Sequence, residues 1–289
     1  MTHFDFSIAS IQALAHADVA RALAEDVGAG DLTAGLIDPQ RRARARVLVR
    51  ESAVLCGSAW AAAAVLALDP SATLTWHAAE GQRVQADTVV LHMEGHAQAL
   101  LTAERTALNF LQLLSAVATH TASFVAAIAE VPGNRAVIVD TRKTLPGLRL
   151  AQKYAVRAGG GTNHRIGLFD AVLIKENHIA AAGGVTAALQ RAQTVAAQAQ
   201  FVEIEVETLA QLDEALNAGA RMVLLDNMTF AQMRQAVALN AGRAILEVSG
   251  GVNMDTVRDI AATGVDRISI GALTKDVRAT DFSMRFEDL

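Results

Sequence analysis

The feature that most constrains the fold is a regular alternation in the second half of the chain. After Pro132, six short runs rich in Val, Ile and Leu alternate with segments whose apolar residues recur at helical spacing. The runs are apolar on both faces, as in buried parallel strands that are connected by crossover helices. The pattern predicts an α/β fold with a closed or nearly closed barrel; a doubly wound open sheet is the alternative. The six predicted strands are 136–139, 171–174, 202–206, 222–225, 244–248 and 267–270.

The first half of the chain has a different pattern, typical of a sheet with helices on one side. A long helical pattern at 98–130, which contains no Pro or Gly, joins the two halves. We therefore expect an N-terminal α/β domain with the helical link over residues 1–115 and a C-terminal α/β barrel over residues 116–289. The other elements predicted in the first half are helices at 7–25 and 58–68 and strands at 42–56, 72–76 and 88–93.

Composition excludes several classes of protein. Hydrophobic residues make up 52% and charged residues 19%, which excludes a disordered chain. The net charge of −5 argues against nucleic-acid or membrane-surface partners. The single Cys56 excludes an internal disulfide and fits a reducing compartment. Because the start has no signal-peptide pattern and the longest apolar stretch, 59–68, is shorter than the ~20 residues of a membrane helix, we expect a cytoplasmic protein.

Polar or Gly-rich residues lie at the end of each of the six predicted strands, and the third strand carries acids within it as well. In α/β barrels the chemistry lies at the carboxyl ends of the strands. Contact with water explains one or two polar residues there, but not one set after every strand, so we expect a functional site at this end. The residues are Asp140 to Lys143; Lys175 to His178; Glu203, Glu205 and Glu207; Asp226 and Asn227; Ser249 to Gly251; and Gly271 with Ala272.

Basic residues are concentrated in the middle of the chain. Between Arg105 and Lys175 there are nine basic residues and only three acids, in a protein that is acidic as a whole. This distribution favours a small, multiply charged anion as the ligand. Part of the excess has another reading, because Arg149, Lys153 and Arg157 recur four residues apart, as on a solvated helix face.

Two glycine motifs follow the last two predicted strands. Ser249, Gly250 and Gly251 follow one strand, and Ile270, Gly271 and Ala272 follow the other. Glycines at these positions allow backbone N–H groups to approach a phosphate near a helix N-terminus. Tight turns are the alternative reading of each motif alone; the two together predict a phosphate site.

Glu205 and Asp226 end neighbouring predicted strands, so their carboxylates are expected to converge. Such a pair suits Mg²⁺ or a cationic sugar centre. By strand alternation Glu203 lies deeper on the same side. His164 stands beside Arg165 after a Gly-rich segment and is a candidate anion ligand.

Together these motifs closely resemble the quinolinate phosphoribosyltransferase family, whose members are also called carboxylating nicotinate-nucleotide pyrophosphorylases. The resemblance covers nearly the whole chain. It implies an open-faced α/β sandwich domain followed by an irregular, TIM-like α/β barrel. It also implies a homodimer with shared active sites. The matching segments are EDVGAGDLT (25–33), ERTALNFLQLLSAVAT (104–119), DTRKTLPGLRLAQKYAVRAGGGTNHRIGLFDAVLIKENHI (140–179), VEIEVE (202–207), VLLDNM (223–228) and LEVSGGV (246–252).

The resemblance implies a reaction and a set of site residues. The enzymes convert quinolinate and phosphoribosyl pyrophosphate, with Mg²⁺, to nicotinate mononucleotide, pyrophosphate and CO₂ in NAD synthesis. Lys143, Glu205 and Asp226 would be catalytic, and the same two acids would serve the ribose and the metal. The 5′-phosphate would be held by Ser249, Gly250, Gly251, Ile270, Gly271 and Ala272. The other substrate ligands would be Thr141, Arg142, His164, Arg165, Lys175 and, reaching the neighbouring subunit's site, Arg105.

Three alternatives stay open at this point. One is a Schiff-base aldolase that uses Lys143 or Lys175 as its nucleophile. Another is a relative that acts on nicotinate or a different base, although the many cations fit a dicarboxylate better. The third is a phosphosugar-binding protein on the same scaffold that lacks activity.

Overall fold

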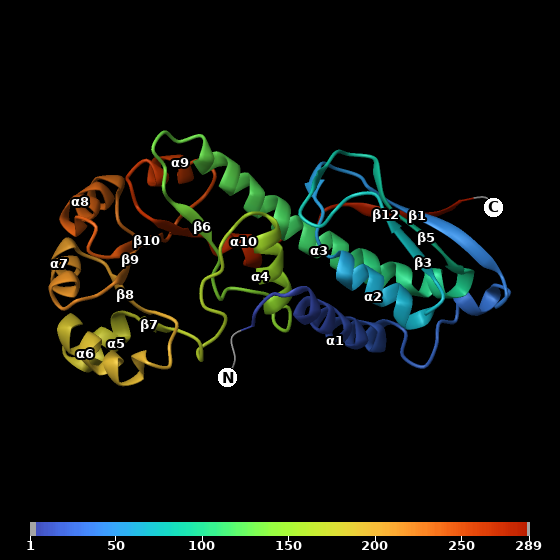
Figure 1. Ribbon diagram of the computed structural model, residues 1–289, viewed down its shortest axis with the longest axis horizontal. Helices are drawn as coiled ribbons and strands as arrows, with labels where there is room; N and C mark the ends of the chain where they lie inside the picture. The colour runs from blue at the N-terminus through green and yellow to red at the C-terminus, as the bar shows by residue number, and fades with distance from the viewer. Residues whose placement is uncertain (1–3, 288–289) are drawn as a thin grey trace. The chain divides into compact units, whose positions relative to one another are not determined.

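The computed structural model describes residues 4–287, which form two compact units (Figure 1). The barrel unit consists of residues 123–144 and 161–275; the sandwich unit consists of residues 4–122, 145–160 and 276–287. The long helix α3 (Ala97–Ala129) contributes residues to both. Two elements from the second half of the chain, α4 (Arg149–Ala158) and β12 (Phe282–Glu287), belong to the sandwich unit, so the units are not two consecutive segments of chain.

An antiparallel sheet with strand order β12-β1-β5-β3 forms the sandwich unit's sheet layer. In β1 (Arg42–Val49), residues 43, 45, 47 and 49 are buried and the residues between them are partly exposed. Because successive side chains point to opposite faces, this alternation leaves one face of the sheet open, as the sequence pattern predicts. The other strands are β3 (Thr73–Trp76) and β5 (Thr88–His96), and a separate short pair joins β2 (Ala53–Val54) to β4 (Arg83–Val84).

Three helices of this unit begin at the predicted places: α1 (Ile8–Asp26), α2 (Ser58–Leu68) and α3. A short 3₁₀ helix, η1 (Ala34–Leu36), lies between α1 and β1. Among the described residues, α3 is the one helix long and apolar enough to cross a membrane by length and composition. Since 56% of its most apolar stretch is buried within the fold, α3 also has the burial of a core helix.

The barrel unit contains the predicted parallel sheet, with strand order β6-β11-β10-β9-β8-β7. The first two strands along the chain, β6 and β7, lie at its two edges. Beside β6, residue Thr162 donates its N–H to Ile138 O (2.8 Å) and accepts from Asp140 N (3.1 Å), as a partial extra strand. The result is an irregular α/β barrel. The strands are β6 (Val137–Val139), β7 (Val172–Ile174), β8 (Val202–Val206), β9 (Met222–Asp226), β10 (Ile245–Ser249) and β11 (Arg267–Ser269).

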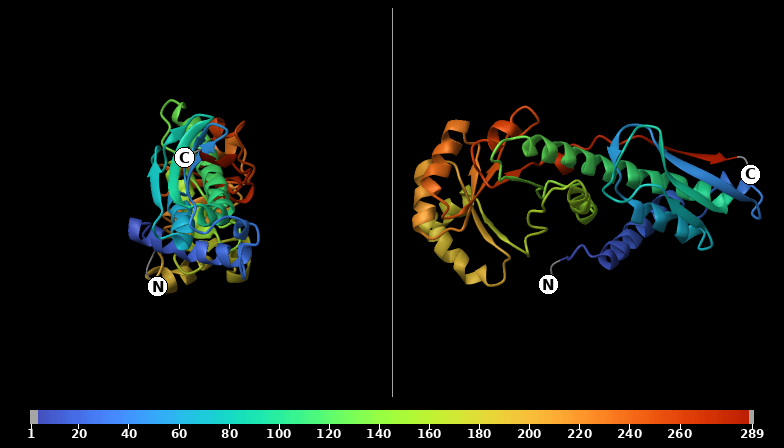
Figure 2. Two further views of the ribbon diagram at one scale, coloured as in Figure 1. Left: turned by 90° about the vertical axis from the view of Figure 1, so that its right-hand side faces the viewer. Right: turned by 45° about the horizontal axis from the view of Figure 1, so that its top comes forward.

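Helices cover the outer side of these strands (Figures 1 and 2). Two begin with reciprocal capping boxes, formed by Thr208 with Gln211 and by Thr229 with Gln232. Each crossover helix begins after the carboxyl end of a strand, so the connecting loops gather at one end of the sheet. The helices are α5 (Glu176–Ala182), α6 (Val185–Ala196), α7 (Leu209–Asn217), α8 (Phe230–Asn240), α9 (Val257–Ala261) and α10 (Ala272–Lys275).

Candidate active site

A cavity of about 160 Å³ opens at the carboxyl ends of the barrel strands. Eight of the residues singled out from the sequence line it, although they come from five different segments of the chain. They are Thr141, Arg142, Lys143, His164, Arg165, Lys175, Glu205 and Ser249. Four further residues complete the lining: Leu173, Leu224, Glu247 and Ser269.

The remaining predicted residues lie outside this lining. Asp226 ends β9 and is partly buried. The glycine motifs continue directly from the ends of β10 and β11. Arg105 lies on α3 within the sandwich unit, where its side chain is exposed, and is not among the residues that line the cavity.

Each glycine motif contains a position where an added side chain would be crowded, most severely at Gly250. Gly250 adopts φ +98°, and a Cβ added there would collide with the side-chain amide of Asn227. A Cβ on Gly271 would lie 3.0 Å from Cδ of Lys143. The Lys143 side chain therefore runs along the second glycine motif, which brings a predicted cation to a predicted phosphate loop.

The main chain around Lys143 is fixed by two hydrogen bonds. Lys143 N donates to Thr141 Oγ1 (3.1 Å), and Thr274 Oγ1 donates to Lys143 O (2.9 Å). On the other side of the barrel, Lys175 Nζ donates to Glu205 Oε2 (3.2 Å). Hydrogen bonds therefore hold the main chain of Lys143 and the ammonium group of Lys175 at the cavity.

Arg165 is buried close to another guanidinium. Burial lowers the pKa of Arg165, the positive charge of Arg142 lowers it further, and Asp170 and Glu203 act in the opposite direction. Like charges brought together in a partly desolvated cavity repel each other. A ligand with two carboxylates would relieve this repulsion and accept hydrogen bonds from both planar forks.

The pKa of Glu205 depends on its burial and on the charged groups around it, which include the carboxylate of Asp226. Burial raises its pKa, the contact with Lys175 lowers it, and the charges of Asp226 and Glu176 raise it. The carboxylates of Glu205 and Asp226 therefore interact across the ends of β8 and β9. Two hard oxygen donors of this kind are the ligands that Mg²⁺ prefers, and a cation between them would remove their repulsion.

A layer of side chains beneath the predicted residues was missed by the sequence reasoning. Leu173, Leu224, Glu247 and Ser269 stand two residues before Lys175, Asp226, Ser249 and Gly271 respectively. Strand alternation was the available signal, because residues two apart in a strand point to the same face. The sequence argument applied that rule to Glu203 alone.

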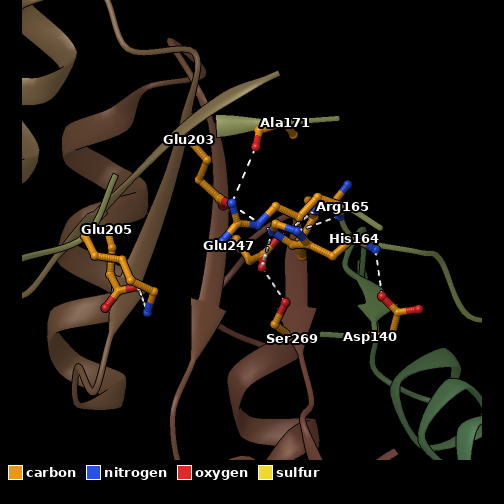
Figure 3. A network of polar contacts seen from close by, with 10 residues as sticks. Asp140, His164, Arg165, Ala171, Glu203, Glu205, Glu247 and Ser269 are labelled. Atoms are coloured by element: carbon orange, nitrogen blue, oxygen red, sulfur yellow. Dashed lines mark hydrogen bonds and ion pairs between the residues drawn. The ribbon is translucent and has the colours of Figure 1, made fainter. Parts of the chain in front are cut away.

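Glu203, Glu247 and His164 form a buried cluster in this layer (Figure 3). Both carboxylates are fully buried. Burial raises the pKa of Glu203 to about 8; the charge of Glu205 also raises it, whereas Arg267 and Arg165 lower it. Burial, followed by the neighbouring Glu203, raises the pKa of Glu247.

The same three residues could in principle hold a metal ion, because a histidine and two carboxylates are metal ligands and their ligand atoms lie within 4.8 Å of one another. The hydrogen bonds oppose a metal there. His164 Nδ1 accepts from Arg165 N (2.7 Å), so Nε2 must carry the ring proton that a metal would replace. Arg267 also occupies Glu247 Oε2, at 2.7 Å. We therefore assign no metal to this cluster.

Other basic side chains that were weighed from the sequence have different environments. Lys153 is fully buried within the fold, so the solvated-face reading of α4 does not hold for it. Arg157 lies over the ring of Phe6, 5.0 Å from its centroid. His178 accepts from Lys175 N (2.9 Å) through Nδ1 and caps α5, a structural role.

A cationic cavity lies at the carboxyl ends of the parallel strands, beside a carboxylate pair and two glycine loops. This arrangement defines a barrel enzyme for a small, phosphorylated anion. The model of the quinolinate phosphoribosyl transferase C-terminal domain matches residues 117–285, and that of the N-terminal domain matches residues 31–115. The chain belongs to the quinolinate phosphoribosyltransferase family, which confirms the resemblance seen in its sequence.

Relatives and solved structures agree over nearly the full length. The chain is 43% identical over 266 residues to a probable nicotinate-nucleotide pyrophosphorylase [carboxylating] of Synechocystis, covering 91% of this chain and 89% of that protein. It is 38% identical over 260 residues to the Bacillus subtilis protein of the same name, covering 90% and 89%. The nicotinate-nucleotide pyrophosphorylase structure from Francisella tularensis superposes with a TM-score of 0.91 at 43% identity, covering 96% and 97%.

Proposed function

We propose that this chain transfers a phosphoribosyl group from phosphoribosyl pyrophosphate to quinolinate and releases CO₂, giving nicotinate mononucleotide and pyrophosphate for NAD synthesis. Family membership supports the reaction. The observation that carries the proposal is the closeness of two guanidiniums, that of the buried Arg165 and that of the partly buried Arg142, in a cavity that also contains Lys143 and Lys175. A pyridine dicarboxylate and a pyrophosphate are the anions that such a concentration of positive charge suits.

Quinolinate binding follows from this arrangement. The forks of Arg142 and Arg165 pair with its two carboxylates, with Thr141 and His164 beside them. Leu173 and Leu224 supply an apolar surface for the pyridine ring. Bidentate contacts with the Arg forks fix the orientation of the ring, which directs the pyridine nitrogen toward C1′ of the ribose.

Transfer begins as the bond between C1′ and the pyrophosphate lengthens. C1′ gains positive charge, and the carboxylates of Glu205 and Asp226 stabilise it. Lys143 or Lys175 neutralises the departing pyrophosphate. The pyridine nitrogen supplies the electron pair for the new bond to C1′ and becomes cationic.

Decarboxylation follows from that new charge. The cationic nitrogen stabilises the electron pair left on C2 when the adjacent carboxylate departs as CO₂, and a proton from solvent then completes nicotinate mononucleotide. The 5′-phosphate is held by the main chain of Ser249, Gly250 and Gly251 and of the second motif, Ile270, Gly271 and Ala272.

Mg²⁺ is proposed as the cofactor, held by Glu205 and Asp226 together with phosphate oxygens of the substrate. The donor set fits, because both are carboxylates and their mutual repulsion contributes to the raised pKa of Glu205. When bound, the ion would neutralise charge on the pyrophosphate.

We further propose a homodimer in which Arg105 reaches the partner's cavity. Its exposed place on the part of α3 that belongs to the sandwich unit is compatible with that role. Mixing inactive Arg105→Ala and Lys143→Ala proteins would then restore activity, since a hybrid dimer has one intact site. A random mixture should regain about a quarter of wild-type activity. No recovery, with exchange of subunits verified, would place Arg105 in its own chain's site or in none.

The proposed location is the cytoplasm, with small-molecule partners and with neither nucleic acid nor membrane involved. The buried thiol of Cys56 is compatible with a reducing compartment. Fractionation of cells should find the protein with the soluble fraction; recovery with membranes would contradict this.

The test of the reaction is mass spectrometry of protein, phosphoribosyl pyrophosphate and Mg²⁺ with quinolinate, and with nicotinate in a parallel tube. Nicotinate mononucleotide from quinolinate alone, with one CO₂, supports the proposal. Product from nicotinate alone overturns the substrate assignment and keeps the barrel and phosphate site. Borohydride trapping of a carbonyl substrate on Lys143 or Lys175 would instead support aldolase chemistry.

A further inference from the structure

Both ring nitrogens of His164 are engaged by protein groups beneath the cavity (Figure 3). Nε2 lies 2.8 Å from Glu203 Oε2 and 3.5 Å from Glu247 Oε1. On the other side of the ring, Nδ1 accepts a hydrogen bond from Arg165 N at 2.7 Å. The imidazole therefore contacts carboxylates through one nitrogen and main chain through the other.

These contacts fix the tautomer of His164. A backbone N–H is a donor, so Nδ1 must offer its lone pair to Arg165. The ring proton is then on Nε2, where it faces the carboxylate of Glu203. His164 is consequently a neutral imidazole with Nε2–H, oriented by an acceptor on one side and a donor on the other.

The position of Arg165 depends on the same contact. Its main-chain N–H is held by His164, and its Nη1 donates to Ala171 O at 3.4 Å. The ring of Phe201 packs edge-on against His164, with centroids 5.3 Å apart. These contacts leave Arg165 few alternative conformations, and Arg165 lines the cavity.

The carboxylate of Glu247 is anchored by two side chains of β11. Glu247 accepts from Arg267 Nε at 2.7 Å and from the Ser269 hydroxyl through its other oxygen. Glu203 projects from β8 next to it and is fully buried. Removing Glu203 would take away the nearer acceptor of the His164 Nε2–H, which disfavours the observed tautomer.

We propose that Glu203 and Glu247 are positioning residues for the dicarboxylate substrate: they hold His164 as the Nε2–H tautomer, and His164 in turn fixes the main chain from which the Arg165 guanidinium reaches the cavity. The inference rests on the proposed function for the identity of the substrate. Glu203 is not among the residues that line the cavity, whereas Glu247 is; we assign both an action through His164. Preorganisation of this kind lowers the ordering cost of binding, so its loss appears in the affinity for quinolinate.

The matched variants are Glu203→Leu, which removes the acceptor at similar volume, and Glu203→Gln, which retains one. Glu203→Leu is expected to raise KM for quinolinate about 10- to 100-fold, as losses of orienting partners do. KM for phosphoribosyl pyrophosphate should change much less. Glu203→Gln is expected to stay within about threefold of wild type because its amide oxygen can accept from Nε2–H.

Asp266→Ala controls for loss of stability alone. Asp266 accepts from Leu246 N (2.8 Å) and lies 3.1 Å from Arg135, at the opposite end of the strands β10 and β11. The Asp266→Ala variant should have a lower Tm and an unchanged KM for quinolinate. If Glu203→Leu does not fold, Glu247→Gln is the second variant, because its amide cannot serve both Arg267 and His164 as the carboxylate does.

A measurement without turnover separates this proposal from the proposed reaction. In ¹⁵N-histidine NMR at pH 7, with the His164 signal assigned by His164→Gln, wild type should show the Nε2–H form. Glu203→Leu should shift that signal toward the other tautomer. A charged or Nδ1–H ring in the wild type, or unchanged KM in folded Glu203→Leu, would overturn the proposal. Absence of nicotinate mononucleotide in wild type with His164 in the Nε2–H form would instead refute the proposed reaction.

Discussion

The two units of this protein carry arginine side chains in different electrostatic environments. In the sandwich unit, Arg44 on β1 lies 3.1 Å from Glu287 and Arg50, just after β1, lies 2.9 Å from Asp87, with side chains that are at least partly exposed. In the barrel unit, Arg165 is buried and its strongest charged neighbour is Arg142. An exposed ion pair on an open face calls for no ligand, whereas an anionic ligand would relieve the repulsion between Arg142 and Arg165.

The largest expected effects come from cavity residues that act on the developing charges. Lys143→Ala and Glu205→Ala should each lower kcat about 10²- to 10³-fold, because each removes charge that stabilises the transition state. Quinolinate affinity should change less than kcat. Steady-state kinetics, with Arg50→Ala in the sandwich unit as control, measures the difference in kcat. Intact turnover in either cavity variant would remove the role assigned to that residue.

Replacing a cavity guanidinium by an ammonium tests whether a planar fork is needed. Arg165→Lys retains the charge but loses bidentate pairing, so KM for quinolinate should rise about tenfold or more. Arg46→Lys, on the open sandwich face, should leave KM unchanged. Equal effects of the two variants on KM would show that the different environments of Arg165 and Arg46 do not matter for quinolinate binding.

The buried carboxylate of Glu203 predicts a pH dependence of stability. Its pKa is about 8 in the folded protein against a reference value of 4.5, so between these values the folded state binds more protons than the unfolded state. The free energy of unfolding contributed by this group is therefore highest below pH 4.5 and falls as pH rises through 8. Glu203→Gln does not titrate.

The stability of Glu203→Gln relative to wild type should accordingly increase from pH 5 to pH 8. Urea unfolding of both proteins at several pH values measures the difference. Parallel stability curves across this range would show that Glu203 has an ordinary pKa, and would contradict its burial among other acids.

The smallest effects are expected on the sandwich sheet. Arg44→Ala removes exposed ion pairs with Glu94 and Glu287, and pairs of this kind contribute about 1 kcal/mol or less. Thermal unfolding should show a small change that added salt reduces. A loss of several kcal/mol, or of activity, would mean that this face is more than a solvated surface.

The alternation of apolar runs was sufficient to predict the barrel strands, because buried parallel strands leave a strong local pattern. Every predicted strand overlaps an observed one, from β6 to β11. It was harder to predict which segments of the chain belong to which of the two units. β12 pairs with β1 through Phe282 and Val49, residues separated by most of the chain, and no local pattern specifies such a partner.

Site residues at the ends of strands could be predicted from the sequence. Site residues further inside the strands were harder to predict. Lys143, Lys175 and Glu205 were identified because polar residues at strand ends are conspicuous. Glu247 was missed because it reads as one acid within an apolar run, although alternation from Ser249 points to it. The contact between His164 and Glu203 joins segments 39 residues apart and required the three-dimensional structure.

The central claim is that the closely spaced guanidiniums of Arg142 and Arg165 select a dicarboxylate. The most direct measurement compares nicotinate, as an inhibitor, with quinolinate, as a substrate, in the wild type and in Arg165→Lys. The account predicts that nicotinate inhibits with a constant about 100-fold or more above KM for quinolinate, and that this ratio falls in the variant, because an unmatched buried charge costs binding free energy. Equal affinity of the wild type for both acids would contradict it.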